Sequence, residues 1–231
     1  MDLADIRNEV SRVIGLDTTA AGADETLVDQ WANEAVLDIL LETRCHIALA
    51  TTTTTANQGD YDLDVDILHV VDLYDTSSSN RYRLQQVSPA RLLDMRVTSN
   101  AQATAPVTHF AVAGSNLLML YPIPSGTDTL TIYYVPRPTA MSTGTDDPSD
   151  AANGGIPAEF HRAIVKYVEA EAADYRDDQT SQHGDRYRAD YARWLGKIRK
   201  AVNQKGNTDT PAFEIRGRSY PPHDPSTDIR C

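Results

Sequence analysis

The sequence contains few cysteines and no long apolar run. Cys45 and Cys231 are its only cysteines, and because they do not form a CxxC pair, a disulfide scaffold is excluded. We expect Cys45 to act as a small, half-buried apolar residue in a reducing compartment. No stretch approaches the run of about 20 apolar residues that a membrane-spanning helix needs, so we predict a soluble chain without a membrane partner.

The usual signatures of enzymes are also missing. None of the six histidines lies in an HExxH or HxH pattern or has a carboxylate or cysteine at metal-ligand spacing. The sequence has no phosphate-binding GxxxxGK[ST] loop, no GxGxxG after a strand and no GxSxG elbow, so nucleotide and serine-hydrolase chemistry lack their usual residues. We therefore predict that the chain is not an enzyme, has no catalytic residues and binds neither a cofactor nor a metal.

One acidic run has two possible interpretations. Asp60, Asp62, Asp64 and Asp66 alternate along the chain as ligands do in an EF-hand loop. The run lacks the loop glycine and the closing glutamate of that motif. A solvated strand edge is therefore favoured over a calcium site.

The net charge of -12 is spread unevenly along the chain. Residues 1–78 hold sixteen Asp or Glu against three arginines, whereas residues 179–218 hold nine Lys or Arg against four acids. The acidic half of a single chain does not attract phosphates, so binding to duplex DNA is disfavoured. If many copies line a tube, the same acidic face would repel a passing duplex and keep it from sticking.

Apolar spacing predicts two helices at the start of the chain. Residues 2–16 place apolar side chains at three- and four-residue intervals, and Gly15 ends this helix. A second, longer helix is expected over about 24–44.

Residues 46–136 differ in composition, because threonine and other β-branched residues become frequent. Turns typical of Gly, Pro and Asn separate the strand candidates. The predicted strands cover residues 47–55, 61–63, 68–74, 82–87, 107–113, 117–121 and 129–135. A short helix is expected over 88–95, with Ser88 as its cap and Pro89 at its first position.

Two further helices are predicted near the C-terminus, after a linker over 137–155 that is rich in Pro, Thr, Ser, Asp and Gly. The first begins at Ile156-Pro157, and the two should pair as an antiparallel hairpin. Beyond Gly206 the sequence has no apolar periodicity, and four prolines prevent regular structure. Such a tail has no core of its own, so it is either disordered alone or laid along a partner.

Together these elements predict an α+β fold. We expect a helical bundle of two N-terminal and two C-terminal helices, with an inserted antiparallel β-rich region and an extended C-terminal arm. The predicted division is N-terminal helices 1–45, β-rich insertion 46–136, linker 137–155, C-terminal helical hairpin 156–206 and C-terminal arm 207–231.

Three segments, taken in order, carry a resemblance to a known family. The first is the helix around Trp31-Ala32-Asn33-Glu34-Ala35, with its Asn-x-Ala pattern. The second is a pair of strands over 110–124 and 130–138, in which a proline and a short turn are followed by a strand that contains tyrosine and then by Arg-Pro. The third is Ile156-Pro157-Ala158-Glu159-Phe160-His161, which leads into a tyrosine-rich helix hairpin. The chain resembles the head-to-tail adaptor (connector) family of tailed bacteriophages over about residues 2–204.

The resemblance implies a structural subunit that forms a ring, expected to be a dodecamer, beneath the portal protein in the virion neck. Such a ring extends the DNA channel, lets DNA pass through its lumen without sequence-specific binding, and gives tail or stopper proteins a docking surface. It would assemble in the host cytoplasm. The resemblance also implies that the arm reaches the portal, and the candidate anchors are Phe213, Ile215, Arg216, Arg218 and Tyr220.

The residues leave two other functions open. Another neck or tail protein, such as a stopper or a tail completion subunit, belongs to the same structural class, but those proteins are usually smaller and β-dominated. A carbohydrate- or partner-binding β module is suggested by tyrosines expected in strands, namely Tyr61, Tyr74, Tyr82, Tyr121, Tyr133 and Tyr134. Aromatic strand residues are nevertheless core residues more often than sugar platforms.

Overall fold

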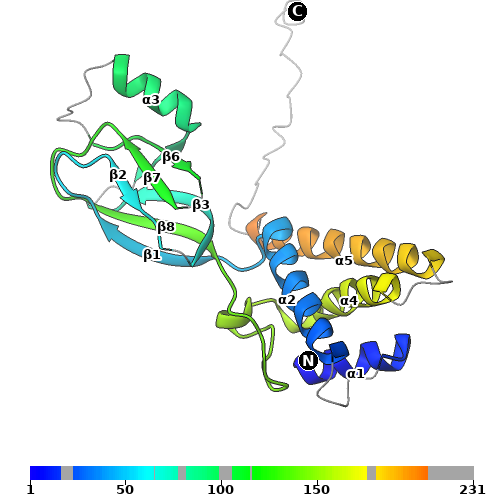
Figure 1. The fold of residues 1–231 in the computed structure, drawn as a ribbon. Helices are drawn as coiled ribbons and strands as arrows, with labels where there is room; N and C mark the ends of the chain where they lie inside the picture. Colours follow the sequence, from blue (N-terminus) through cyan, green and yellow to red (C-terminus); the bar gives the residue numbers. More distant parts are fainter. Residues whose placement is uncertain are drawn as a thin grey trace, which may run out of the picture.

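The computed structural model describes residues 1–16, 23–64, 66–77, 82–98, 106–114, 116–175 and 181–207. Within these residues the chain forms two parts that lie side by side, a group of four helices and a pair of β-sheets with one more helix (Figure 1). The predicted α+β class is therefore confirmed. The helices of the first part come from both ends of the described chain, and the strands come from between them.

The helical part consists of segments far apart in sequence. Its helices are α1 (Leu3–Ile14), α2 (Ala23–Thr43), α4 (His161–Tyr175) and α5 (Ser181–Asn207). α1 begins at a capping box, in which the side chains of Asp2 and Asp5 each accept from the other's backbone N–H. It ends at Gly15, whose φ of 75° lies in the left-handed region that favours glycine.

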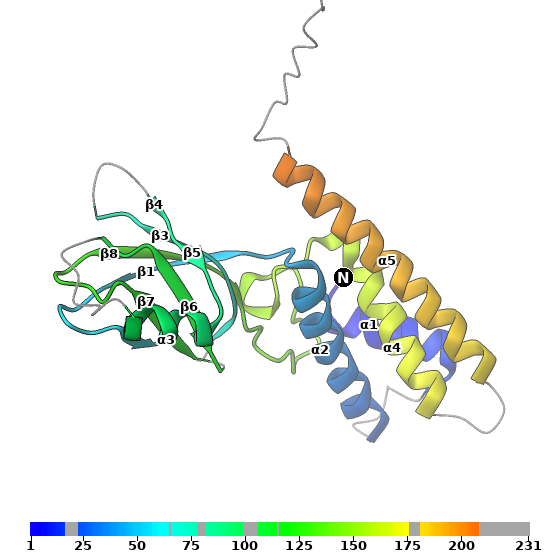
Figure 2. The same ribbon diagram turned by 90° about the horizontal axis from the view of Figure 1, so that it is seen from above.

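One apolar core holds the four helices together. α4 contacts α1, α2 and α5, and it runs alongside α5 (Figure 2). The fully buried core residues include Leu3, Ile6, Val10, Val28, Ala32, Ile39, Ile164, Val168 and Ile198. Because burial of one large apolar side chain contributes about 1.5–3 kcal/mol, this core is the main source of stability in the helical part.

The first sheet has the strand order β1-β8-β3-β4, and all its pairs are antiparallel. Its strands are β1 (Ala48–Thr53), β8 (Thr129–Pro136), β3 (Ile67–Asp75) and β4 (Tyr82–Arg83). Leu49 lies opposite Tyr133, and Tyr74 lies opposite both Thr131 and Arg83. Because residues directly opposite each other share a face, these side chains lie on one side of the sheet.

The second sheet has the strand order β2-β7-β6-β5. Its strands are β2 (Asp60–Asp62), β7 (Leu117–Tyr121), β6 (His109–Ala113) and β5 (Gln85–Gln86). The pairs are antiparallel except that β5 runs parallel to β6. The single strand predicted over 82–87 is wrong, because the buried residue Leu84 lies where the chain crosses between the sheets, leaving a two-residue strand on each side.

The two sheets share a core, and helix α3 (Pro89–Thr98) covers the far side of the second sheet (Figure 1). The core between the sheets includes Val70, Leu73, Phe110, Leu118, Leu120, Leu130 and Ile132. Alternate residues of β6 and β7 point the other way, so Ala111 and Met119 pack against Leu92 of α3. The second sheet is therefore buried on both faces.

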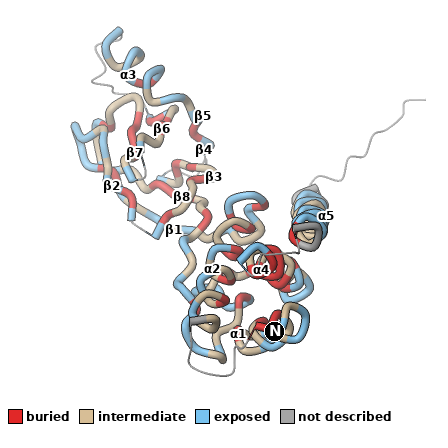
Figure 3. The backbone as a smooth tube through the Cα atoms, turned by 45° about the vertical axis from the view of Figure 1, so that its right-hand side comes forward, coloured by how far each residue is buried: buried red, intermediate tan, exposed pale blue. Residues whose placement is uncertain are grey.

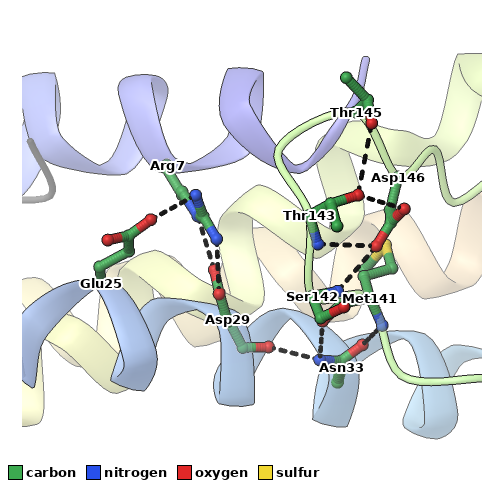
Figure 4. A network of polar contacts seen from close by, with 9 residues as sticks. All are labelled: Arg7, Glu25, Asp29, Asn33, Met141, Ser142, Thr143, Thr145 and Asp146. Atoms are coloured by element: carbon green, nitrogen blue, oxygen red, sulfur yellow. Dashed lines mark hydrogen bonds and ion pairs between the residues drawn. The ribbon is translucent and has the colours of Figure 1, made fainter. Parts of the chain in front are cut away.

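Residues 137–155 connect β8 to the last two helices and are fastened to the helical part. Met141 is buried in the helical core. The side chain of Asn33 in α2 donates to the Met141 carbonyl at 3.0 Å and accepts from its N–H at 2.7 Å (Figure 4). α4 begins at His161 and not at residue 156, because Pro157 has an extended ψ of 139° and precedes a separate turn. The two 3-10 turns here are η1 (Ala151–Asn153) and η2 (Ala158–Phe160).

Candidate interaction surfaces

Within the described ranges, no group of three or more His, Cys, Asp or Glu is placed to hold a metal ion. Of the acidic run, Asp60 pairs with Arg96 of α3 at 2.8 Å. Arg96 also donates to the backbone oxygens of Gly59 and Leu120 at 2.7 and 2.9 Å, so this end of the run helps to fasten α3 to its sheet. None of the helices that the structure describes is both long and apolar enough to span a bilayer.

Two histidines fasten segments near the junction of the two parts. His161 is buried, and its ring nitrogens lie 3.1 Å from the carbonyl oxygen of Met1 and 2.9 Å from that of Ile156. The ring of His46 lies so close to Gly155 that a Cβ on this glycine would come within 2.5 Å of Nδ1. Both histidines therefore have structural contacts that account for them.

Stability should fall as the pH drops through the titration range of histidine. Burial lowers the pKa of His46, and burial together with the nearby charge of Arg44 lowers the pKa of His69. The unfolded chain therefore binds these protons more readily, so the native state loses stability as the pH falls below about 6.5 and regains it as the pH rises. Melting temperatures recorded between about pH 5 and about pH 7.5 measure how stability changes with pH.

The double variant His46→Asn and His69→Asn is the matched comparison for this pH dependence. Its melting temperature should vary less with pH in the same window, because both proton-binding groups are gone. If the melting temperature of the double variant changes with pH as much as that of the unchanged chain, groups other than these two histidines cause the pH dependence.

Tyr82 is an exposed residue of the short strand β4, and the other five tyrosines of the described strands fall into two groups. Tyr61, Tyr121 and Tyr134 pack against the core of the sheets or beneath α3, so they serve the fold. Tyr74 and Tyr133 lie on the outer side of the first sheet, where their ring centroids are 5.4 Å apart in an edge-on contact. Both rings of this second group are partly exposed.

The outer side of the first sheet is hollowed around this tyrosine pair. The hollow has a volume of about 400 Å³ and is called the tyrosine hollow below; it is lined by Leu49, Tyr74, Thr76, Thr131 and Tyr133. Leu49 is 56% exposed although it is apolar. No charged side chain belongs to this set of described residues, and uncharged surfaces with aromatic residues are typical of protein contacts.

A polar network joins α1 to α2 (Figure 4). Arg7 donates from Nε and Nη2 to the two carboxylate oxygens of Asp29, at 2.7 and 2.6 Å. Its Nη1 pairs with Glu25 at 2.5 Å. This two-pronged geometry fixes the guanidinium in the plane of the Asp29 carboxylate, so the network sets the angle between the helices as well as holding them together.

Replacing Arg7 with methionine should lower the free energy of unfolding by about 1–3 kcal/mol, because two half-buried carboxylates would lose their cation. The side chains of Asp29 and Glu25 are only 19% and 26% exposed. Urea denaturation measures the change. The matched control is Arg12→Met, whose side chain is 73% exposed and which should change stability by less than about 0.5 kcal/mol. Equal losses in both variants would contradict this role of Arg7.

Helix α5 presents a basic surface to solvent. Its exposed basic residues are Arg186, Arg188, Arg193, Lys197, Arg199 and Lys200. Arg199 pairs with Glu42 near the end of α2, which places the last turns of α5 beside the point where the chain leaves α2 for β1. The last turns of α5 therefore lie close to the junction of the two parts (Figure 1).

From residue 208 onward, the predicted arm over 207–231 lies outside the described residues, and Asn207 is the last residue of α5. All five candidate portal anchors lie outside the described residues; they are Phe213, Ile215, Arg216, Arg218 and Tyr220. Their contacts remain a prediction.

Several exposed apolar residues were not singled out from the sequence. Among them are Leu49 on β1, and Leu93 and Val97 on α3, which are 56%, 49% and 85% exposed. A partial signal existed for α3, because residues four apart in a helix share a face. The sequence does not show which face of α3 would be covered, so the exposure could be recognised only from the structure.

Among the described residues, the structure has apolar cores in both parts, exposed basic residues on α5 and an uncharged hollow on the outer side of the first sheet. The comparison with protein families then gives the particular family, because the family model described as SU10 adaptor protein matches residues 1–218. The chain belongs to this family of phage head-to-tail adaptors. No curated protein matches the sequence.

Family membership confirms the resemblance found in the sequence. The chain is a structural adaptor protein of a bacteriophage, a role that is not enzymatic and that implies a place in the virion neck.

Proposed function

We propose that the chain is one subunit of a dodecameric ring below the portal, which extends the DNA channel and gives tail or stopper proteins a docking surface. The observation that carries this proposal is the family match over residues 1–218. In the ring, the four helices act as a bundle formed by residues 1–45 and 156–206, the sheets of 46–136 are an insertion joined through the linker 137–155, and residues 207–231 are an extended arm.

The charge distribution fits a channel that does not retain DNA. Exposed carboxylates occur on α1, α2 and β2, for example Asp5, Glu34 and Asp62. The exposed basic residues of α5 lie on a different element. If the acidic elements face the lumen, repeated negative charge repels a passing duplex, which moves through without sequence-specific binding.

The arm is the part that we propose to contact the portal, through Phe213, Ile215, Arg216, Arg218 and Tyr220. Ordering a chain segment costs about 1–2 kcal/mol per residue, so the arm should become ordered only where a preformed groove supplies compensating contacts. A ring that engages many equivalent grooves gains avidity without any strong single contact. Assembly in the host cytoplasm would then be sequential, with the portal first.

Light scattering of the full-length chain tests this proposal. The mass should correspond to a monomer for the chain alone, and the mass of the portal of the same phage should rise by twelve chains when the two are mixed. No change in the mass of the portal would overturn the proposal. Binding only to a portal already occupied by another neck protein would instead identify a stopper, and glycan binding by the monomer would favour a carbohydrate module.

A further inference from the structure

The contact between α4 and α5 contains a buried ion pair. Nζ of Lys166 lies 2.5 Å from Oε2 of Glu169, and the two side chains are 16% and 0% exposed. The same Nζ lies 5.3 Å from the ring centroid of Tyr187, so the pair is beside α5. Among the described residues, Oε1 of Glu169 has no hydrogen-bond partner. Because a buried carboxylate oxygen without a donor has lost its hydration, the packing of α5 on α4 is weakened at this point.

α5 also buries little apolar surface for its length. It is the longest described helix, with 27 residues, yet Ile198 is its one buried apolar residue among those whose side chains the structure describes. α4 has 15 residues and buries seven apolar side chains, among them Ile164 and Val168. The other apolar contacts of α5 come from half-buried residues such as Tyr191 and Trp194. Because fewer side chains are removed from water, α5 is held less firmly than α4.

The ion pairs that join α5 to the other helices are exposed. Arg188 pairs with Asp174 of α4, and Arg199 pairs with Glu42 of α2. All four side chains are 40–50% exposed, and ion pairs in contact with water contribute little to stability. A hydrogen bond from the half-buried Tyr191 to a carboxylate of α2 is the better protected contact among the described side chains.

The helical part keeps most of its core when α5 is left out. Ile198 is the one buried core residue that comes from the described part of α5, whereas α1, α2 and α4 share residues such as Ile6, Ile39 and Ile164. Figure 3 shows α5 at one side of the helical part, with much of its surface exposed. α5 can therefore separate from α4 without unfolding the other three helices.

We infer that α5 is a movable helix, which opens from α4 as a unit in the free chain and closes again after the chain has attached. This inference rests on the proposed function, because the arm assigned to the portal follows α5 in the chain. Swinging α5 about its first turn moves its last turn by on the order of 40 Å, the length of 27 helical residues. The opening extends the reach of the arm, and a longer reach speeds capture by a partner.

Hydrogen exchange of the full-length chain tests the opening without the portal. After correction for intrinsic rates, amides of residues 190–200 should exchange at least about tenfold faster than those of residues 164–173, because α5 opens without global unfolding. Equal protection of the two segments would overturn the inference.

Two variants of the buried pair should shift this exchange in opposite directions. Lys166→Met together with Glu169→Leu replaces the pair by apolar side chains of similar size, so exchange over residues 190–200 should slow by about tenfold. Lys166→Met alone leaves the Glu169 carboxylate buried without its cation, so exchange there should become faster. A cooperative melting transition shows that each variant is folded. If the double variant does not fold, the single variant decides, and unchanged exchange in it would contradict the role of the pair.

The matched control is Arg193→Gln together with Asp190→Asn. It removes the same number of charges from an ion pair of the same three-residue spacing, whose arginine points to solvent on α5. Exchange over residues 190–200 should stay as in the unchanged chain. If the control slows exchange as much as the double variant of the buried pair, loss of charge alone explains the effect, and the inference fails.

The rate of attachment to the portal of the same phage tests what the opening does. The double variant Lys166→Met and Glu169→Leu should bind immobilised portal at least about fivefold more slowly than the unchanged chain, because α5 is open less often. The final amount bound should be equal, because α5 is closed both before and after attachment. Equal rates would overturn the inference. If the unchanged chain does not bind the portal, the proposed function fails, whereas the exchange experiment still decides whether α5 opens.

Discussion

Ending the chain after Gly206 should abolish attachment to the portal and leave the melting temperature nearly unchanged. Val202 is the last residue of α5, among those whose side chains the structure describes, that packs against the helical core, and the truncation keeps it. The predicted anchors Phe213, Ile215 and Tyr220 are all lost. Co-sedimentation with the portal measures attachment, and circular dichroism measures the melting temperature.

A shorter truncation is the matched control for this experiment. Ending the chain after Pro225 also removes the C-terminus but keeps all five candidate anchors, so attachment should persist. If the chain truncated after Gly206 still attaches to the portal, the proposed role of the arm is refuted. If both truncations lose attachment, the contacts lie in residues 226–231 and not at the predicted anchors.

The substitution Phe110→Ala should lower the free energy of unfolding by about 3–5 kcal/mol. Phe110 on β6 is 1% exposed and belongs to the core between the two sheets. Removing its ring leaves a cavity that both sheets line, and close-packed cores relax only partly around such a gap. Urea denaturation followed by far-ultraviolet circular dichroism measures the loss.

The control for Phe110→Ala is Leu93→Ala on the nearby helix α3. Leu93 is 49% exposed, so this change should cost less than about 0.5 kcal/mol in the unassembled chain. A loss below about 1 kcal/mol for Phe110→Ala would contradict the shared core between the sheets.

Regular periodicity made the helices of the helical part predictable. The spacing over 2–16 identified α1, whose bounds are Leu3–Ile14, and the glycine at position 15 was expected to end it, as its left-handed conformation confirms. The strand predicted over 117–121 matches β7. In these segments the residues favour the element locally and also place their apolar side chains on its buried face. The sequence alone is therefore sufficient to predict the element.

Long-range contacts were not predictable from local pattern. The sequence gives no local sign that the side chain of Asn33 binds the backbone of Met141, 108 residues later. It also does not show that the chain passes from the first sheet to the second at Leu84. The tyrosine hollow depends on which side of the first sheet stays uncovered, and that is decided by packing. The candidate anchors of the arm were chosen from the sequence, and they remain predictions.

Electron cryo-microscopy of the neck of the intact virion would locate the chain in the assembled particle. We predict a ring of twelve copies immediately below the portal, with α1, α2, α4 and α5 as its helical body and the chain after Asn207 in contact with the portal. Density for this chain elsewhere in the virion, or a neck without it, would contradict the assignment as a head-to-tail adaptor.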